Sequence, residues 1–186
     1  MTQAQAACVA VFCGANDGRQ PHYVSAARKL GQALAERGVA LVYGGSARGL
    51  MGALADAALA AGGSVTGIIP VGLEDTERTH RGLTRLERVA DIAERKTRFH
   101  ALADAYVALP GGIGTLDELF DVLTQRQLGN ISAPVHALSV DGYFDPLVRL
   151  LTQQVAEGFM PAETLRTLSI DTDINTLIER LAPLPQ

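Results

Sequence analysis

Short, continuous apolar runs alternate with longer amphipathic segments along the chain. Continuous runs are typical of strands that are covered on both faces of a sheet. The expected strands are Cys8–Cys13, Val39–Tyr43, Ser64–Ile69, Ala105–Leu109 and Val135–Val140, with a weaker one at Leu86–Ala90. The expected helices are His22–Arg37, Leu50–Ala61, Asp91–Ala103, Leu116–Leu128, Pro146–Glu157 and Ile174–Leu181. This order predicts an α/β fold with a doubly wound parallel sheet and helices on both faces.

Length and composition indicate one globular domain over residues 1–186, with a frayed tail at 181–186. A hydrophobic content of 47% excludes a disordered chain. A net charge of −4 and the absence of Trp argue against a nucleic-acid partner. The sequence shows no leader, no apolar run long enough to cross a membrane and no metal-ligand spacing of Cys or His. We therefore expect a cytoplasmic protein with reduced Cys8 and Cys13, no metal and no membrane partner.

Two glycine-rich segments follow the ends of predicted strands. Gly44–Gly52 comes after the second strand, and Pro110–Thr115 comes after Ala105–Leu109. Ligands of doubly wound sheets bind at the carboxyl ends of the strands, where a glycine loop before a helix brings backbone N–H groups close to an anion. The alternative is that the glycines only turn the chain tightly. Neither segment completes a P-loop or a dinucleotide fingerprint, so a mononucleotide or a sugar phosphate is the expected ligand.

Three charged residues lie where a buried helix face is expected. Arg95 and Lys96 follow Ile92 by three and four positions, so they flank the apolar stripe of their helix. They either extend to solvent or clamp an anion or a carboxylate. Glu118 follows Thr115 by three positions, which is the spacing of a capping box. Alternatively, Glu118 reaches the ligand of the glycine loop, where a carboxylate could activate water or stabilise an oxocarbenium-like centre.

Together these motifs resemble the LONELY GUY (LOG) family of cytokinin riboside 5′-monophosphate phosphoribohydrolases, which have a Rossmann-like fold. Pro110–Glu118 matches the family pattern P-G-G-x-G-T-x-x-E, and Arg95-Lys96 matches its arginine–lysine pair. The resemblance covers roughly residues 8–160. Further matches are Val11–Gly14, Tyr43–Gly45, Gly49–Gly52, Gln127–Gly129, Val140–Tyr143 and Glu157–Phe159.

The resemblance implies hydrolysis of the N-glycosidic bond of AMP or an N6-substituted adenosine 5′-monophosphate, which releases adenine or a cytokinin and ribose 5-phosphate. No cofactor is implied. By position, Arg95 and Glu118 correspond to the catalytic pair of the family. The implied substrate-binding residues are Glu77, Lys96, Gly111, Gly112, Ile113, Gly114, Thr115, Thr124, Gly44 and Gly45. Members of the family are usually homodimers with sites near the interface, so we expect a homodimer.

Two other functions stay open from the sequence. A carrier of a nucleotide or phosphorylated cofactor, as in the molybdenum-cofactor carrier proteins of similar fold, would bind its ligand without cleaving it. A nucleotide-sensing regulatory module is the other. Proteins similar to this family were once labelled lysine decarboxylases, but no pyridoxal-binding arrangement is evident around Lys29 or Lys96. Departures from the family pattern at Ala15-Asn16, Ser46 and Ile92-Ala93 leave the base preference open.

Overall fold

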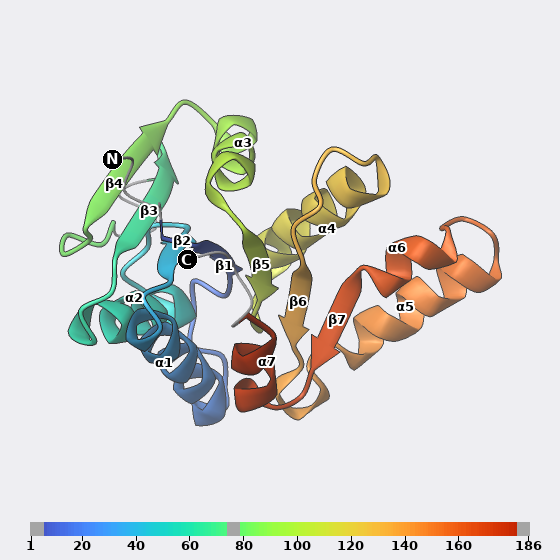
Figure 1. Cartoon of the computed structure of the whole chain (residues 1–186), viewed down its shortest axis with the longest axis horizontal. Coiled ribbons are helices and arrows are strands. Elements are labelled where there is room, and N and C mark those ends of the chain that lie inside the picture. The colour runs from blue at the N-terminus through green and yellow to red at the C-terminus, as the bar shows by residue number, and fades with distance from the viewer. Residues whose placement is uncertain (1–5, 74–78, 182–186) are drawn as a thin grey trace.

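In the described part of the chain, residues 6–73 and 79–181 of a computed structural model, seven parallel strands form one sheet in the order β4-β3-β2-β1-β5-β6-β7 (Figure 1). The strands are β1 (Cys8–Phe12), β2 (Ala40–Tyr43), β3 (Val65–Pro70), β4 (Arg85–Val89), β5 (Ala105–Ala108), β6 (Val135–Leu138) and β7 (Leu168–Asp171). The helices are α1 (Pro21–Glu36), α2 (Gly49–Ala60), α3 (Ile92–Leu102), α4 (Ile113–Gln127), α5 (Asp145–Ala156), α6 (Ala162–Arg166) and α7 (Ile174–Leu181), with a short 3-10 turn, η1, at Val140–Gly142.

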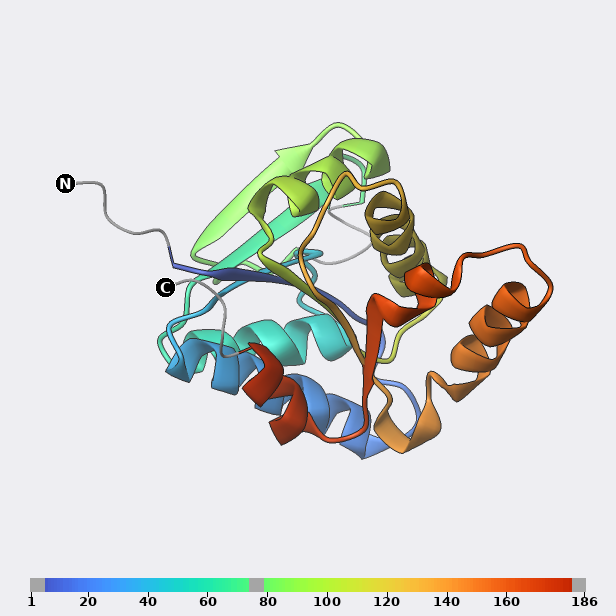
Figure 2. The same cartoon turned by 45° about the vertical axis from the view of Figure 1, so that its right-hand side comes forward.

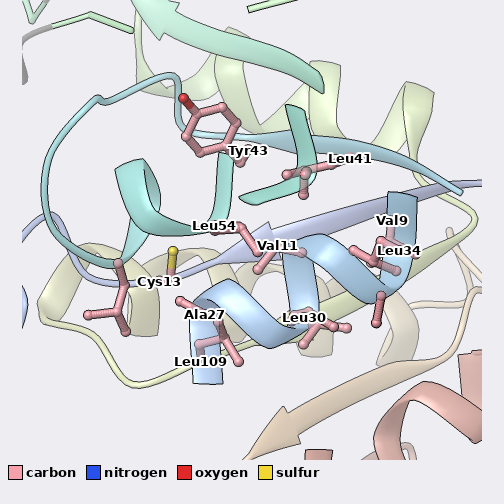
Figure 3. Packing of buried hydrophobic residues seen from close by; sticks show 14 of the residues in the cluster. Val9, Val11, Cys13, Ala27, Leu30, Leu34, Leu41, Tyr43, Leu54 and Leu109 are labelled. Atoms are coloured by element: carbon pink, nitrogen blue, oxygen red, sulfur yellow. The ribbon is translucent and has the colours of Figure 1, made fainter. Parts of the chain in front are cut away.

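Helices cover both faces of the sheet, which Figure 2 shows as the middle layer. On one face, Leu30 of α1 and Leu54 of α2 join Val9 of β1 in a buried cluster (Figure 3). On the other face, Phe99 of α3 and Leu119 of α4 belong to a second buried cluster. Successive side chains of a strand point to opposite faces, so each apolar residue of the central strands contributes to one of the two clusters. This arrangement confirms the predicted doubly wound α/β fold.

The strand order reverses between β1 and β5. The chain adds β2, β3 and β4 outward from β1, then returns to place β5 on the other side of β1. Phe12 pairs with Ala108 at the ends of these two strands, so the loops after them leave the sheet side by side. The amide of Gly14 donates a 3.1 Å hydrogen bond to the Pro110 carbonyl and joins the two loops. Such a reversal is where ligands bind in doubly wound folds.

Most predicted elements are confirmed, including the weaker strand, which is β4. β7 and α6 were not predicted from the sequence. β7 is a four-residue edge strand with two half-buried positions, and α6 has only five residues, so neither leaves a periodic pattern long enough to recognise. The expected frayed tail is wrong at Leu181, which ends α7 and is buried. The rest of that tail lies outside the described residues.

The start of α4 differs from the prediction and removes one interpretation of Glu118. The helix begins at Ile113, three residues earlier than expected, and its N-cap is Gly112. Thr115 therefore lies inside the first turn, where it is buried, and it cannot cap the helix. The capping-box interpretation of Thr115 and Glu118 is wrong.

Candidate functional site

A cavity of about 350 Å³ opens at the strand-order reversal. Its walls come from the end of β1, from the loops after β1, β2 and β5, from residues of α1, α2, α3 and α4, and from Tyr143 after η1. The volume is in the range of small-ligand sites. Seven predicted site residues line it together: Gly44, Arg95, Gly111, Gly112, Gly114, Thr115 and Glu118.

The glycine loop between β5 and α4 needs its glycines for two different reasons. A Cβ at Gly111 would lie 2.1 Å from the Thr115 hydroxyl oxygen and 2.9 Å from the Gly14 nitrogen, so a side chain cannot fit there. At Gly112 and Gly114, by contrast, an added Cβ would meet no atom of the described residues within 4 Å. The start of α4 has backbone N–H groups without helical partners, and an open, glycine-lined approach lets an anion reach them.

Arg95 is brought into the cavity from α3 although it is a charged residue. Its side chain is only 7% exposed. Its Nη2 donates a 2.7 Å hydrogen bond to the carbonyl of Gly44 at the end of β2, and its guanidinium lies 5.8 Å from the centre of the Phe99 ring. The interpretation that Arg95 extends to solvent is therefore wrong. Its charge is held at the cavity wall, where it can neutralise an anion.

Glu118 lines the same cavity from the second turn of α4 and is half-buried. Burial raises the pKa of the Cys13 thiol, and the negative charge of Glu118 raises it further. The Glu118 carboxylate is thus close enough to the end of β1 to act on Cys13 electrostatically. A cation from α3 and a carboxylate from α4 consequently face one cavity that also holds the glycine loop. This is the arrangement expected if both act on a bound phosphate ester.

Lys96 and Thr124 do not line the cavity. The Lys96 ammonium forms a 2.9 Å ion pair with Asp117 of α4 and so bridges α3 to α4. The Thr124 hydroxyl donates a 2.8 Å hydrogen bond to the carbonyl of Phe120, and the residue is exposed. In this single chain both residues stand outside the cavity that contains Arg95.

The other predicted binding residues have mixed positions. Ile113 is 84% exposed and points away from the core, although its backbone is part of the first turn of α4. Gly45 adopts a left-handed conformation (φ 81°) next to Ile69 of β3, outside the cavity lining. Glu77 lies outside the described residues.

Several lining residues were missed as site residues. They are Val11, Cys13, Gly14, Ala15, Asn16, Asp17, Gly18, Tyr23, Leu50, Met51, Pro110 and Tyr143. The motif matches Val11–Gly14 and Val140–Tyr143 were signals for two of these places, but neither pattern says which side chain faces a ligand. No group of three or more potential metal ligands occurs within the described ranges. In the same part of the chain, no helix is both long and apolar enough to cross a membrane.

A cavity at the strand reversal of a parallel sheet, with a glycine loop leading into a helix, is typical of Rossmann-like α/β proteins, in which such loops receive phosphate groups. The family model described as "Possible lysine decarboxylase" matches residues 51–181. The chain is 44% identical over 155 residues to the probable cytokinin riboside 5′-monophosphate phosphoribohydrolase LOGL1 of Oryza sativa subsp. japonica. This alignment covers 83% of this chain and 70% of that protein. The chain is 42% identical over 171 residues to the cytokinin riboside 5′-monophosphate phosphoribohydrolase of Rhodococcoides fascians, covering 91% and 86%. The chain therefore belongs to the LOG family.

Solved structures agree on the fold. The molybdenum cofactor carrier protein of Chlamydomonas reinhardtii aligns with a TM-score of 0.74 at 19% identity, over 97% of this chain and 98% of that one. The molybdenum cofactor binding protein of Rippkaea orientalis aligns with a TM-score of 0.72 at 22% identity, over 96% and 97%. At these identities the likeness concerns the fold alone.

Proposed function

We propose that this chain hydrolyses the N-glycosidic bond of a nucleoside 5′-monophosphate and releases the free base and ribose 5-phosphate. The observation that carries the proposal is that Arg95 and Glu118, from two different helices, line one cavity with the glycine loop. The names of the relatives, cytokinin riboside 5′-monophosphate phosphoribohydrolases, point to N6-substituted adenosine monophosphates as substrates. AMP is the unsubstituted member of the same class.

The proposed mechanism assigns a task to each part of the cavity. The 5′-phosphate binds at the start of α4, where backbone N–H groups and the helix dipole favour an anion. The bond between C1′ of the ribose and the base nitrogen breaks through an oxocarbenium-like state, which the Glu118 carboxylate stabilises. Glu118 also orients the water that adds to C1′ and accepts its proton, while the base leaves with the electron pair of the broken bond and takes up a proton from solvent. Arg95 positions this carboxylate and offsets its charge as the base leaves.

Release of base from AMP and from N6-isopentenyl-AMP, followed by chromatography, tests the proposal. Glu118→Gln should lower kcat by at least about 100-fold, the lower range for a lost general base. Asp121→Asn is the matched control, because Asp121 lies three residues further along α4 and pairs with His100 at 2.7 Å, outside the cavity lining. Its kcat should stay within a few-fold of wild type. Full activity of Glu118→Gln contradicts the assignment, and ligand retention without base release indicates a carrier instead.

We also propose that the chain forms a homodimer through α4. Ile113, Phe120 and Leu128 lie on one side of this helix and are 84%, 37% and 64% exposed. Thr124 lies on the same side, so a second copy seated there would cover a predicted binding residue. Phe120→Asp should convert a dimer to a monomer in light scattering, whereas Phe159→Asp, at an 85% exposed aromatic after α5, should not. The reverse result would move the interface to α5.

The proposed partner is thus a small phosphorylated molecule rather than nucleic acid, in keeping with the net charge of −4. Both cysteines are free thiols, which fits a reducing cytoplasm, the proposed location.

A further inference from the structure

The turn after β6 has an unusual backbone. Asp141 in η1 adopts the left-handed conformation (φ 50°, ψ 38°), and it is the one non-glycine residue with positive φ within residues 6–73 and 79–181. Non-glycine residues seldom adopt this conformation, and Asp is among the few that tolerate it. The Asp141 carboxylate contacts Nε2 of His22 at the start of α1. Gly142, also left-handed (φ 73°), completes the turn.

This turn delivers Tyr143 to the cavity. The Tyr143 hydroxyl donates a hydrogen bond to the carbonyl of Gly111 in the glycine loop. Its ring meets the Tyr23 ring edge to face at 5.8 Å and the Phe144 ring at 5.2 Å. Phe144 is 1% exposed, and its amide donates a 3.0 Å hydrogen bond to the Ser139 hydroxyl. The tyrosine is therefore fixed from the core side as well as from α1.

Gly111 is the residue on which the glycine loop depends. On its inner side there is no room for a Cβ between Thr115 and Gly14, and the carbonyl of its neighbour Pro110 accepts a hydrogen bond from Gly14. On its outer side the Gly111 carbonyl accepts the Tyr143 hydrogen bond. Rotation of the Gly111 carbonyl would turn the peptide that joins Gly111 to Gly112. It would also shift the N–H groups at the start of α4. The loop is thus held from two sides.

We propose that Tyr143 is a positioning residue for phosphate binding, which acts by fixing the Gly111 peptide so that the first amides of α4 stay directed into the cavity. The inference rests on the proposed function for the identity of the substrate, but not for the presence of a phosphate site. A purely structural tether would lower stability and leave phosphate affinity unchanged. A positioning role changes the affinity for the phosphate group and leaves the chemical step unchanged.

The test compares Tyr143→Phe with Tyr106→Phe. Both changes remove one hydrogen-bonded hydroxyl, but Tyr106 bonds His100 at 2.9 Å and does not line the cavity. Tyr143→Phe should weaken ribose 5-phosphate binding by about 5- to 10-fold in calorimetry, which is about the effect of one lost hydrogen bond. It should raise KM for the nucleotide by a similar factor and leave kcat within about twofold. Tyr106→Phe should leave the dissociation constant, KM and kcat near wild type.

A second pair of variants tests the same point through the turn. Asp141→Asn tolerates the left-handed conformation, whereas a β-branched side chain does not. Asp141→Val should therefore weaken ribose 5-phosphate binding, and Asp141→Asn should do so much less. Equal binding by Tyr143→Phe and wild type overturns the proposal, as does a fall in kcat with unchanged binding. If wild type binds ribose 5-phosphate but releases no base, the proposed function fails while the binding comparison still decides the role of Tyr143.

Discussion

Replacing Gly44 by alanine should displace the Arg95 side chain although no charged residue is substituted. Gly44 directly follows β2 and lines the cavity, and its carbonyl accepts the 2.7 Å hydrogen bond from Arg95. A Cβ at this position would lie 2.2 Å from Nη2 of Arg95 and 2.8 Å from the Met51 sulfur. Ordinary van der Waals contact begins at 3.4 Å, so the guanidinium must move by about 1.2 Å. The backbone itself is not strained by alanine, because Gly44 does not have a positive φ.

The size of the effect follows from the lost contact. A hydrogen bond to a charged group is worth about 1.5–3 kcal/mol, and 1.36 kcal/mol of transition-state stabilisation is a factor of ten in rate. Gly44→Ala should therefore lower kcat/KM by about 10- to 100-fold if Arg95 acts in the reaction. A displacement of 1 Å at a catalytic group has a cost of the same order. The variant should remain folded, because the atoms that the methyl group would meet are the ends of the flexible Arg95 and Met51 side chains.

A double-mutant cycle tests whether the loss of kcat/KM in Gly44→Ala is caused by the displacement of Arg95. We would measure kcat/KM with AMP for wild type, Gly44→Ala, Arg95→Ala and the double variant. Truncation of Arg95 removes the clashing guanidinium, so the added methyl group should have little further effect in that background. The double variant should match Arg95→Ala. Gly82→Ala, in the loop before β4 and outside the cavity, is the control for a glycine change, since among the described residues its Cβ would meet the His80 ring, at 3.2 Å.

Two results would refute the reasoning. If Gly44→Ala retains wild-type activity, the position of Arg95 does not matter for the reaction. If Gly44→Ala lowers activity by the same factor with and without the arginine, its effect does not pass through Arg95, and Met51 becomes the next residue to test.

Three further predictions concern the fold. The Glu87 pKa is lowered by hydrogen bonds from Arg98, so this pair stabilises the protein at neutral pH. The gap in unfolding free energy between wild type and Glu87→Gln, measured in urea, should narrow as the pH falls below about 4.3 and close below the folded-state pKa. Gly31→Ala should lower the free energy of unfolding by about 1–3 kcal/mol or more, because its Cβ would lie 2.2 Å from a carbonyl oxygen of α2. Burial and the nearby Asp104 carboxylate raise the pKa of Cys8 to about 12, so iodoacetamide at pH 8 should label this thiol in urea but not in the native protein, as mass spectrometry would show.

Sequence patterns predicted the fold well where burial was complete. The strands that became β1, β2, β5 and β6 are apolar runs with almost every residue buried, so periodicity and burial agree. The short edge strand Leu168–Asp171 gave no such signal. Its Asp171 is 2% exposed and pairs with His136 at 3.0 Å and with Arg180 at 3.1 Å. A buried carboxylate held by distant partners has no local signature, because the partners are known only once the chain has folded.

In the candidate site, too, sequence spacing alone could not give what depends on contacts between distant parts of the chain. The spacing of Thr115 and Glu118 fits both a capping box and a ligand site, and only the true start of α4 separates them. That start depends on the packing of Gly111 against Gly14, a contact between loops almost 100 residues apart. The bond from Arg95 to Gly44 spans 51 positions and was equally invisible. Motifs therefore pointed to seven residues that line the cavity, while the contacts that place them there run across the sheet.

Arg95 and Lys96 illustrate how two adjacent positions acquire different tasks. Neighbouring residues of a helix point about 100° apart. From α3, one side chain consequently reaches the end of β2 through Gly44, while the other reaches α4 through Asp117. These two contacts fix α3 against both walls of the cavity. Glu118, which follows Asp117 directly, lines the same cavity as Arg95 from α4. In this single chain Lys96 therefore bridges α3 to α4 outside the cavity, whereas Arg95 lines it.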